Sequence, residues 1–219
     1  MTLALFDLDN TLLAGDSDYS WGQFLVSLGA VDADVYRKAN QQFYEDYKTG
    51  QLDIHEYARF AFKPLSENSQ EQLEEWRQRY VNEIIRPMMT ANGQEKINWH
   101  RRQGDTVVII TATNSFITRP IAESFSVEHL IATEPARKNG QFIAEISGIP
   151  CFKDGKVQRL NAWLDGQAEL TLEGSWFYSD SHNDLPLLEQ VSHPVAVDPD
   201  DELRQIATEK GWEITSFRD

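Results

Sequence analysis

An unbroken apolar run near the start of the chain leads directly into two closely spaced acids. Residues 3–6 read Leu-Ala-Leu-Phe, and residues 7–11 read Asp-Leu-Asp-Asn-Thr. Four consecutive apolar residues without helical spacing are typical of a strand covered on both faces, as in a parallel sheet. Strand alternation places Asp7 and Asp9 on the same side of the chain, where their mutual repulsion favours a bound cation or separate protonation states. The stretch therefore predicts a buried strand ending in a reactive loop suited to Mg²⁺ and to acid/base chemistry, although an isolated Asp-x-Asp also fits an ordinary polar turn.

The rest of the chain divides into a helical stretch and a stretch of alternating strands and helices. Between residues 14 and 103 apolar residues recur at helical spacing, and the second stripe is Val35, Ala39, Phe43 and Tyr47. From Thr106 onward β-branched runs alternate with helical segments, which implies parallel strands joined by right-handed crossovers. The prediction is an α/β fold, a doubly wound Rossmann-like parallel sheet with an all-helical cap inserted after its first strand. Residues 1–13 and 104–219 would form the core domain, and residues 14–103 the cap with its return helix.

Charge and cysteine content limit the possible partners. Lysine and arginine number 20 against 35 for aspartate and glutamate, so the formal charge is 20 − 35 = −15. This excess of negative charge argues against binding to nucleic acid or to an anionic membrane surface. Cys151 is the single cysteine, which excludes an intramolecular disulfide and suits a reducing compartment. With no apolar run of membrane-spanning length and no leader pattern, we expect a cytoplasmic monomer or dimer without a zinc site.

Three further polar stretches follow predicted strands or open a predicted helix. They are residues 111–114 (Thr-Ala-Thr-Asn), residues 179–184 (Ser-Asp-Ser-His-Asn-Asp) and Lys156. In an open parallel sheet the active site lies outside the carboxyl ends of the strands, so these stretches should converge with residues 7–11. Each has a plainer explanation alone: Thr111 ends a strand, Lys156 is a solvated lysine, and Asp180 caps a helix. Their joint occurrence in this order favours one shared site.

The four stretches, in this order, resemble the motifs of the haloacid dehalogenase superfamily of phosphohydrolases. The acid at Asp9 is similar to its phosphatase pattern. The helical insertion and residues 178–188 resemble subfamily IB, which includes phosphoserine phosphatase and a bacterial type of histidinol-phosphatase, and residues 7–18 look closest to the histidinol-phosphatase-like branch. One departure is Asp16, which stands where phosphoserine phosphatases carry a glutamate. The candidates for an arginine that binds a substrate carboxylate are Arg37, Arg59 and Arg77.

The resemblance implies a Mg²⁺-dependent hydrolase of small phosphorylated metabolites that works through an aspartyl-phosphate. Asp7 would be the nucleophile, Asp9 the general acid and base, and Lys156 the cation that neutralises Asp7 and the transferring group. The residues expected to bind phosphate or substrate are Thr111, Ala112, Thr113, Asn114, Asn183, Asp16 and Asp18. The expected metal ligands are Asp7, Asp9, Asp180 and Asp184, the last through water.

Asp16 and Asp18 bear on the substrate because they closely follow the catalytic loop. Two acids at the mouth of the pocket favour a positively charged leaving group, so we expect histidinol phosphate ahead of phosphoserine and a role in amino-acid biosynthesis. An alternative is that both residues only cap the first cap helix. The alternatives of another class are a non-catalytic phosphate-sensing or scaffold protein and a receiver-type signalling domain. The cap insertion counts against the receiver-type domain.

Overall fold

The computed structural model describes residues 2–167 and 169–218, and a six-stranded parallel sheet forms its centre. The strand order is β3-β2-β1-β6-β7-β8. The strands are β2 (Thr106–Asn114), β1 (Leu3–Phe6), β3 (His129–Thr133), β6 (Trp176–Ser179), β7 (His193–Val197) and β8 (Glu213–Thr215). β1 lies between β2 and β6, so the order of the strands reverses next to β1. In such folds ligands bind in the crevice at this reversal, and the loop after β1 opens into it.

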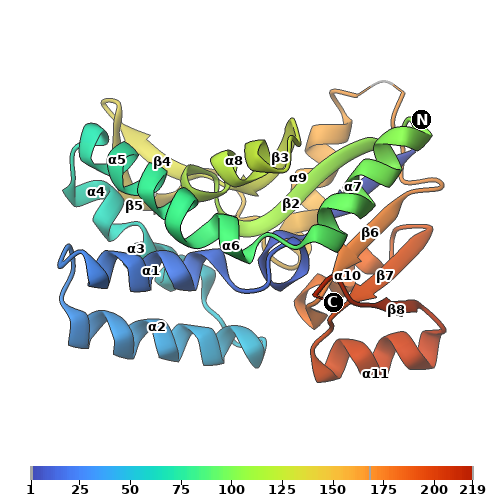
Figure 1. Ribbon diagram of the computed structural model, residues 1–219, viewed down its shortest axis with the longest axis horizontal. Coiled ribbons are helices and arrows are strands. Elements are labelled where there is room, and N and C mark those ends of the chain that lie inside the picture. Colours follow the sequence, from blue (N-terminus) through green and yellow to red (C-terminus); the bar gives the residue numbers. More distant parts are fainter. Residues whose placement is uncertain (1, 168, 219) are drawn as a thin grey trace.

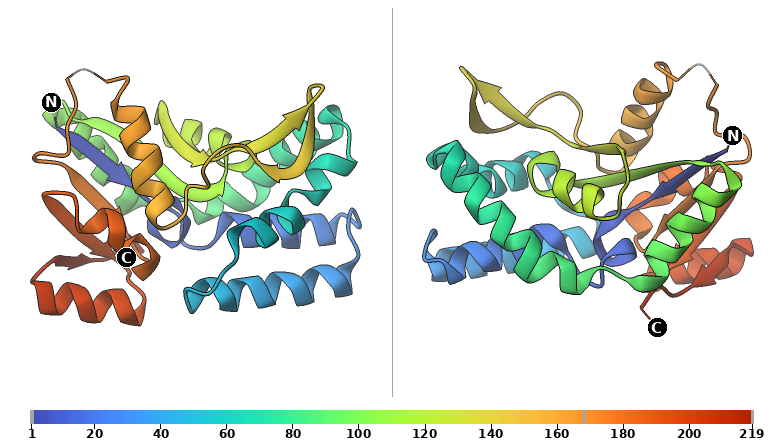
Figure 2. Two further views of the ribbon diagram at one scale, coloured as in Figure 1. Left: turned by 180° about the vertical axis from the view of Figure 1, so that it is seen from behind. Right: turned by 45° about the horizontal axis from the view of Figure 1, so that its top comes forward.

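Helices cover both faces of the sheet, as the doubly wound prediction requires. Alternate residues of β1 enter different cores: Ala4 and Phe6 pack with Ile97 and Ile117 of one layer, whereas Leu5 packs on the opposite face. The helices of the first layer are α7 (Ala91–Gln103) and α8 (Ser115–Ser124), and those of the second are α9 (Asp154–Leu164), α10 (Leu185–Leu188) and α11 (Asp201–Lys210). Figure 2 shows α9 and α7 on opposite sides of the strands. The fold class is thus α/β with a parallel sheet, as the sequence predicts.

The cap is the helical segment between β1 and α7, and it lies beside the carboxyl ends of the strands (Figure 1). Its longer helices are α1 (Ser17–Ser27), α2 (Ala33–Lys48), α3 (Ile54–Ala61) and α5 (Gln70–Tyr80), and its shorter elements are α4 (Lys63–Glu67), η2 (Val81–Ile85) and α6 (Arg86–Met88). Ser69 is the N-cap of α5 and accepts a hydrogen bond from the Gln72 N–H, while the side chain of Gln72 donates to Glu75.

The predicted apolar stripe of α2 is wrong at its first position. Val35 is 64% exposed, while Tyr36 and Asn40 are buried in its place. Asn40 donates from Nδ2 to the carbonyl of Tyr19 at 3.1 Å, so a polar contact with α1 determines which face of α2 points inward. At the start of α2 the buried residues are therefore one position further along the helix than apolar spacing indicates, whereas Phe43 and Tyr47 of the predicted stripe face the pocket.

A two-stranded hairpin extends from the core and packs under the cap. It consists of β4 (Pro135–Lys138) and β5 (Gln141–Ile146), which pair antiparallel. Its second strand contacts both α3 and α4. The cap is thus supported by the core at a second place, far from the point where the chain enters it.

The two ends of the cap lie side by side. Leu13 and Met89 form an antiparallel bridge, the Ala14 N–H donates to the Met88 carbonyl at 2.7 Å, and the Thr90 N–H donates to the Leu12 carbonyl at 3.1 Å. The chain therefore leaves and re-enters the core through one short two-stranded junction. Within the described part of the chain, no helix has the length and apolar character needed to cross a membrane.

Candidate active site

Three loops converge at the carboxyl ends of neighbouring strands. Residues 7–13, the loop that the sequence predicts to be catalytic and that is called the catalytic loop below, follow β1 and contain the single turn η1 (Leu8–Leu12). Residues 111–114 end β2, and residues 179–184 follow β6. The N–H of Asp7 donates to the carbonyl of Tyr178 at 2.9 Å, which continues the sheet pairing into the loop. Parallel pairing on both sides of β1 thus brings these sequence-distant segments to one edge.

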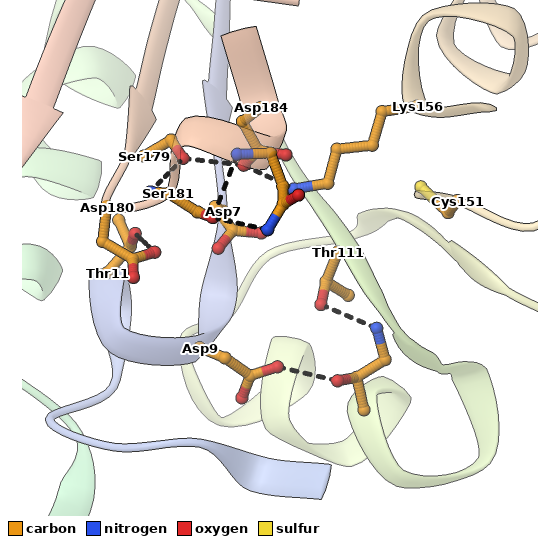
Figure 3. Close-up of polar contacts among 12 residues, drawn as sticks. Asp7, Asp9, Thr11, Thr111, Cys151, Lys156, Ser179, Asp180, Ser181 and Asp184 are labelled. Carbon is orange, nitrogen blue, oxygen red and sulfur yellow. Dashed lines mark hydrogen bonds and ion pairs between the residues drawn. The ribbon is translucent and has the colours of Figure 1, made fainter. Parts of the chain in front are cut away.

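Lys156 connects two buried carboxylates at the centre of this edge. Its Nζ lies 2.8 Å from Asp7 Oδ1 and 2.7 Å from Asp184 Oδ2 (Figure 3). Asp184 Oδ2 also accepts from the Ser179 hydroxyl at 2.7 Å. Burial raises the pKa of Asp7, and the ammonium of Lys156 opposes that rise. The nucleophile candidate is therefore held in one orientation by a charge-assisted contact.

A close backbone approach positions Lys156 at the start of α9. A Cβ at Gly155 would lie 2.0 Å from the carbonyl oxygen of Pro150, so only glycine fits there. The preceding Lys153 has φ +50° and ψ −125°, a conformation that is costly for a residue with a side chain. A strained turn thus lies at the start of α9, the helix from which Lys156 contacts Asp7 and Asp184.

Asp9 faces away from Lys156, toward the cap. Its Oδ1 accepts from the Ser17 N–H at 2.6 Å, and its Oδ2 accepts from the Thr113 hydroxyl at 2.8 Å. Burial raises the pKa of Asp9 to about 6, with a further contribution from the charge of Asp16. A carboxyl group with this pKa exchanges a proton readily near neutral pH, as a general acid and base must.

The predicted metal ligands do not form one cluster of side chains. Among residues 2–167 and 169–218, no three aspartate, glutamate, histidine or cysteine side chains are grouped as a metal site. Asp180 Oδ1 instead accepts from the Thr11 hydroxyl at 3.1 Å, and burial, followed by the charge of Asp7, raises its pKa well above the usual range. Among the described residues, the ammonium of Lys156 is the one cation that acts on Asp7, Asp180 and Asp184, so another cation fits the local charge. Mg²⁺, which keeps several waters and needs few carboxylates, suits Asp7 and Asp180.

The predicted phosphate-binding residues separate into two groups. Thr111, Ala112 and Thr113 line the pocket, and the Thr111 oxygen accepts from the Thr113 N–H at 3.2 Å, which leaves its own O–H free to donate. Asn114 instead caps α8, where its Oδ1 accepts from the Ile117 N–H. Asn183 donates to the carbonyl of Tyr47 at 3.0 Å, so its amide nitrogen contacts the cap.

A pocket with about 650 Å³ of empty space, part of it open to solvent, lies between the catalytic loop and the cap. Its cap side is rich in aromatic rings and carries two acids; the lining residues there are Asp16, Asp18, Tyr19, Asn40, Phe43, Tyr44, Tyr47, Leu52, Ile54 and Tyr57. No lysine or arginine is among the lining residues in the described part of the chain. Of the three candidate arginines, Arg77 donates to the Phe116 carbonyl and pairs with Glu74, Arg37 lies near Asp34 at the surface, and Arg59 is exposed on α3.

Asp16 and Asp18 differ in what they do. Asp16 is the N-cap of α1 and accepts from the Tyr19 N–H at 2.8 Å, as the capping interpretation expects. Asp18, in the first turn, lines the pocket together with Tyr57, whose hydroxyl lowers the pKa of Asp18. Burial raises the pKa of Asp16 to about 6 and that of Asp18 to about 7. Only one of the two acids is therefore used as the helix cap.

Several residues that contact the site were not singled out from the sequence. Tyr57 belongs to the aromatic residues of the helical segment, for which the sequence favours core packing over the alternative of a pocket lining, and the structure places Tyr57 at the pocket. Lys153 donates to the carbonyl of Gly50 at 2.6 Å, and together with the contact from Asn183 to Tyr47 it ties the end of α2 to the core. These contacts join the cap to loops that come more than a hundred residues later.

Arg218 is a further unpredicted contact of the catalytic loop. Its Nη2 donates to the carbonyl of Asn10 at 3.0 Å, and its Nε lies 3.7 Å from Asp198 Oδ2. Asn10 has φ +56°, a left-handed conformation that asparagine tolerates better than most residues. The guanidinium thus braces the bend of the loop between Asp9 and Thr11.

Comparison with known proteins places these features in context. A family model described as haloacid dehalogenase-like hydrolase matches residues 4–189. A histidinol-phosphatase from Neisseria meningitidis serogroup C (strain 8013) is 41% identical over 220 residues, covering 99% of this chain and 99% of that protein. A solved structure of a protein with unknown function from Bordetella pertussis Tohama I is also 41% identical, with a TM-score of 0.91 over 98% of this chain and 99% of the other. A phospho-aspartyl intermediate analogue of phosphoserine phosphatase shares the fold, with a TM-score of 0.71 at 18% identity over 99% of this chain and 93% of the other.

Proposed function

The chain belongs to the haloacid dehalogenase-like hydrolase family and is a phosphatase, and from this premise we propose that it hydrolyses small phosphomonoesters with Mg²⁺ through an aspartyl-phosphate on Asp7. The observation that carries the proposal is the buried contact of Lys156 with Asp7 and Asp184 beside a pocket that Asp9 also lines. As a phosphatase the protein is not the non-catalytic scaffold that the sequence left open.

Each step of the reaction can be assigned to residues at this edge. Asp7 attacks phosphorus, an O–P bond forms, and the bond to the leaving oxygen breaks as Asp9 donates its proton to that oxygen. Asp9 then removes a proton from water, which attacks the same phosphorus and returns Asp7 with release of inorganic phosphate. The Thr111 hydroxyl and the following backbone N–H groups donate to the phosphoryl oxygens, and Lys156 holds Asp7 in position. A bound Mg²⁺ would supply the positive charge that lets a carboxylate approach a phosphate dianion.

Histidinol phosphate is the substrate that the site supports best, and phosphoserine is the alternative. The 41% identical relative is a histidinol-phosphatase, and the pocket of this chain offers carboxylates without an arginine or lysine among its described lining residues. Histidinol phosphate carries an amine and an imidazole and no carboxylate. Phosphoserine would bring its own carboxylate against Asp16 and Asp18 without a cationic partner.

The substrate is tested by measuring kcat/KM for both compounds with Mg²⁺. We expect histidinol phosphate to exceed phosphoserine by at least about tenfold, the ratio for one unpaired charge that costs roughly 1.4 kcal/mol. Equal values of kcat/KM, or a preference for phosphoserine, would refute the substrate assignment but would not contradict the proposed catalytic steps.

The nucleophile is tested with Asp7→Asn, which keeps the shape of the side chain. We expect it to abolish phosphate release from phenyl phosphate, because an amide cannot form the aspartyl-phosphate. Asp165→Asn is the matched control, since Asp165 is exposed at the end of α9. Activity of Asp7→Asn within tenfold of the wild type would refute the assignment.

A further inference from the structure

The cap side of the pocket contains a carboxylate whose charge the protein itself does not offset. Asp18 and Tyr57 both line the pocket, and the hydroxyl of Tyr57 lowers the pKa of Asp18, whereas burial and the negative charge of Asp9 raise it. No lysine, arginine or histidine of residues 2–167 and 169–218 forms an ion pair with Asp18. A carboxylate removed from water is costly unless it gains an opposite charge, so a cationic ligand would complete this position.

Asp16 differs from Asp18 because the backbone of α1 already donates to it. The Tyr19 N–H donates to the Asp16 carboxylate, and this contact is part of the start of α1. A backbone N–H at the start of a helix stabilises the ionised form without any ligand. Of the two acids near the pocket mouth, Asp18 is the one whose contacts are incomplete.

Aromatic rings stand beside Asp18 on the same wall. Tyr57 and Phe43 contact each other edge to face, with ring centroids 5.2 Å apart, and both line the pocket. A flat cation gains from a carboxylate at its edge and from an aromatic face beneath it. The wall therefore suits an imidazolium or a compact ammonium better than an uncharged or anionic group.

We propose that Asp18 and Tyr57 form the subsite for the cationic part of the leaving group, and that Asp18 rather than Asp16 determines the preference for a cation. The proposal rests on the proposed phosphatase function and adds the residues that select its substrate class. Asp7 and the 111–113 loop hold the phosphoryl group at the core side, so a leaving group extending toward the cap meets the Asp18 wall.

The test compares Asp18→Asn with Asp16→Asn, using phenyl phosphate as a substrate whose leaving group has no charge. The readout is the ratio of kcat/KM for histidinol phosphate to kcat/KM for phenyl phosphate. Asp18→Asn should lower this ratio at least about tenfold, and Asp16→Asn should lower it by less. Tyr57→Phe should lower it by a smaller factor, because the carboxylate remains while its hydrogen-bond donor is lost. An unchanged ratio in Asp18→Asn, or a larger loss in Asp16→Asn, would overturn the proposal.

A second measurement separates this proposal from the assignment of the substrate. Histidinol, which carries the cations without phosphate, is added as an inhibitor of phenyl phosphate hydrolysis, and neutral propanol is the control compound. Histidinol should inhibit the wild type, and its inhibition constant should rise at least about tenfold in Asp18→Asn. If histidinol phosphate is not hydrolysed but this inhibition is seen, the proposed substrate fails and the cation subsite stands. If histidinol inhibits no better than propanol, or inhibits both proteins equally, the subsite is refuted.

Discussion

Replacing Asp18 by asparagine should stabilise the protein at alkaline pH while it harms substrate selection. Burial raises the pKa of Asp18 from 3.8 to about 7. Because the folded protein holds this proton more tightly than the unfolded chain, the free energy of unfolding falls as pH rises from about 4 to about 7. The destabilisation is fully present above pH 7 and absent below the pKa of the unfolded chain. Asparagine keeps the shape of the side chain and an oxygen that accepts from Tyr57, but never carries the charge.

The size of the effect follows from the difference in pKa. At 1.36 kcal/mol per pKa unit, the rise of about 3 corresponds to an upper limit of about 4 kcal/mol. Asp18 is only partly buried and opens into the pocket, so solvent screening reduces this to about 2 kcal/mol. For a chain of this length that gain is a rise of about 4 to 8 °C in Tm.

The assay is thermal unfolding of the wild type and Asp18→Asn at pH 5 and pH 8, without substrate. The gain in Tm should be clear at pH 8 and distinctly smaller at pH 5, where most of the wild-type carboxyl is protonated in the folded state. Asp165→Asn, at an exposed position, should show no such difference between the two pH values. A Tm at pH 8 equal to or below that of the wild type, or the same gain at both pH values, would refute the reasoning.

Three further predictions concern the catalytic loop and its metal. Asp9→Asn should form the aspartyl-phosphate from phenyl phosphate, whose leaving group needs little protonation, yet hydrolyse it slowly, so mass spectrometry should detect phosphoenzyme; equal impairment of both steps would count against this role. Chelation of divalent ions should abolish hydrolysis and Mg²⁺ should restore it, whereas Ca²⁺, with looser coordination, should support little turnover; full activity in excess chelator would contradict the metal proposal. Arg218→Ala should lower kcat by about threefold to tenfold with little change in KM, because one hydrogen bond to the Asn10 carbonyl is lost, and Arg218→Lys should recover part of it; an unchanged kcat would show that the contact is dispensable.

The secondary structure was predictable where its signal is local. The apolar run of residues 3–6 and the helical spacing of apolar residues between residues 14 and 103 depend on neighbouring residues alone. The inward face of α2 was not, because it depends on the contact between Asn40 and the carbonyl of Tyr19 on another helix. The spacing of apolar residues cannot identify an inward-facing residue that is polar.

The same distinction applies to the site. The residues that follow β1, β2 and β6 could be expected to meet, since parallel pairing brings strand ends to one edge. The sequence could not show that Asp16 caps α1 while Asp18 lies at the pocket wall with Tyr57. Two acids at the start of a helix look alike until their hydrogen-bond donors are known. The contact of Arg218 with Asn10 joins residues more than two hundred positions apart, and no sequence pattern indicates it.

The extent of the cap as a separate unit stays a prediction, and we propose a revised boundary for it. The sequence suggests residues 14–103, which includes α7. His100 of α7, however, is buried and lies 2.9 Å from the hydroxyl of Tyr178 in the sheet. We propose that the unit ends at the Leu13–Met89 bridge and that α7 belongs with the core.

That junction has a consequence for exchange of caps between relatives. Since the segment enters and leaves through adjacent backbone positions, a cap from another family member could be spliced in at Leu13 and Met89, provided that it also reproduces the contacts of the cap with β5, Lys153 and Asn183. The helical wall around Asp18 would change while Asp7 and Lys156 keep their contact, and the new cap would have to supply the N–H that Ser17 donates to Asp9. Activity assays of such chimaeras would show whether substrate preference is transferred with the cap helices. They would also show whether a change of the inserted cap alone gives the same catalytic residues a new substrate.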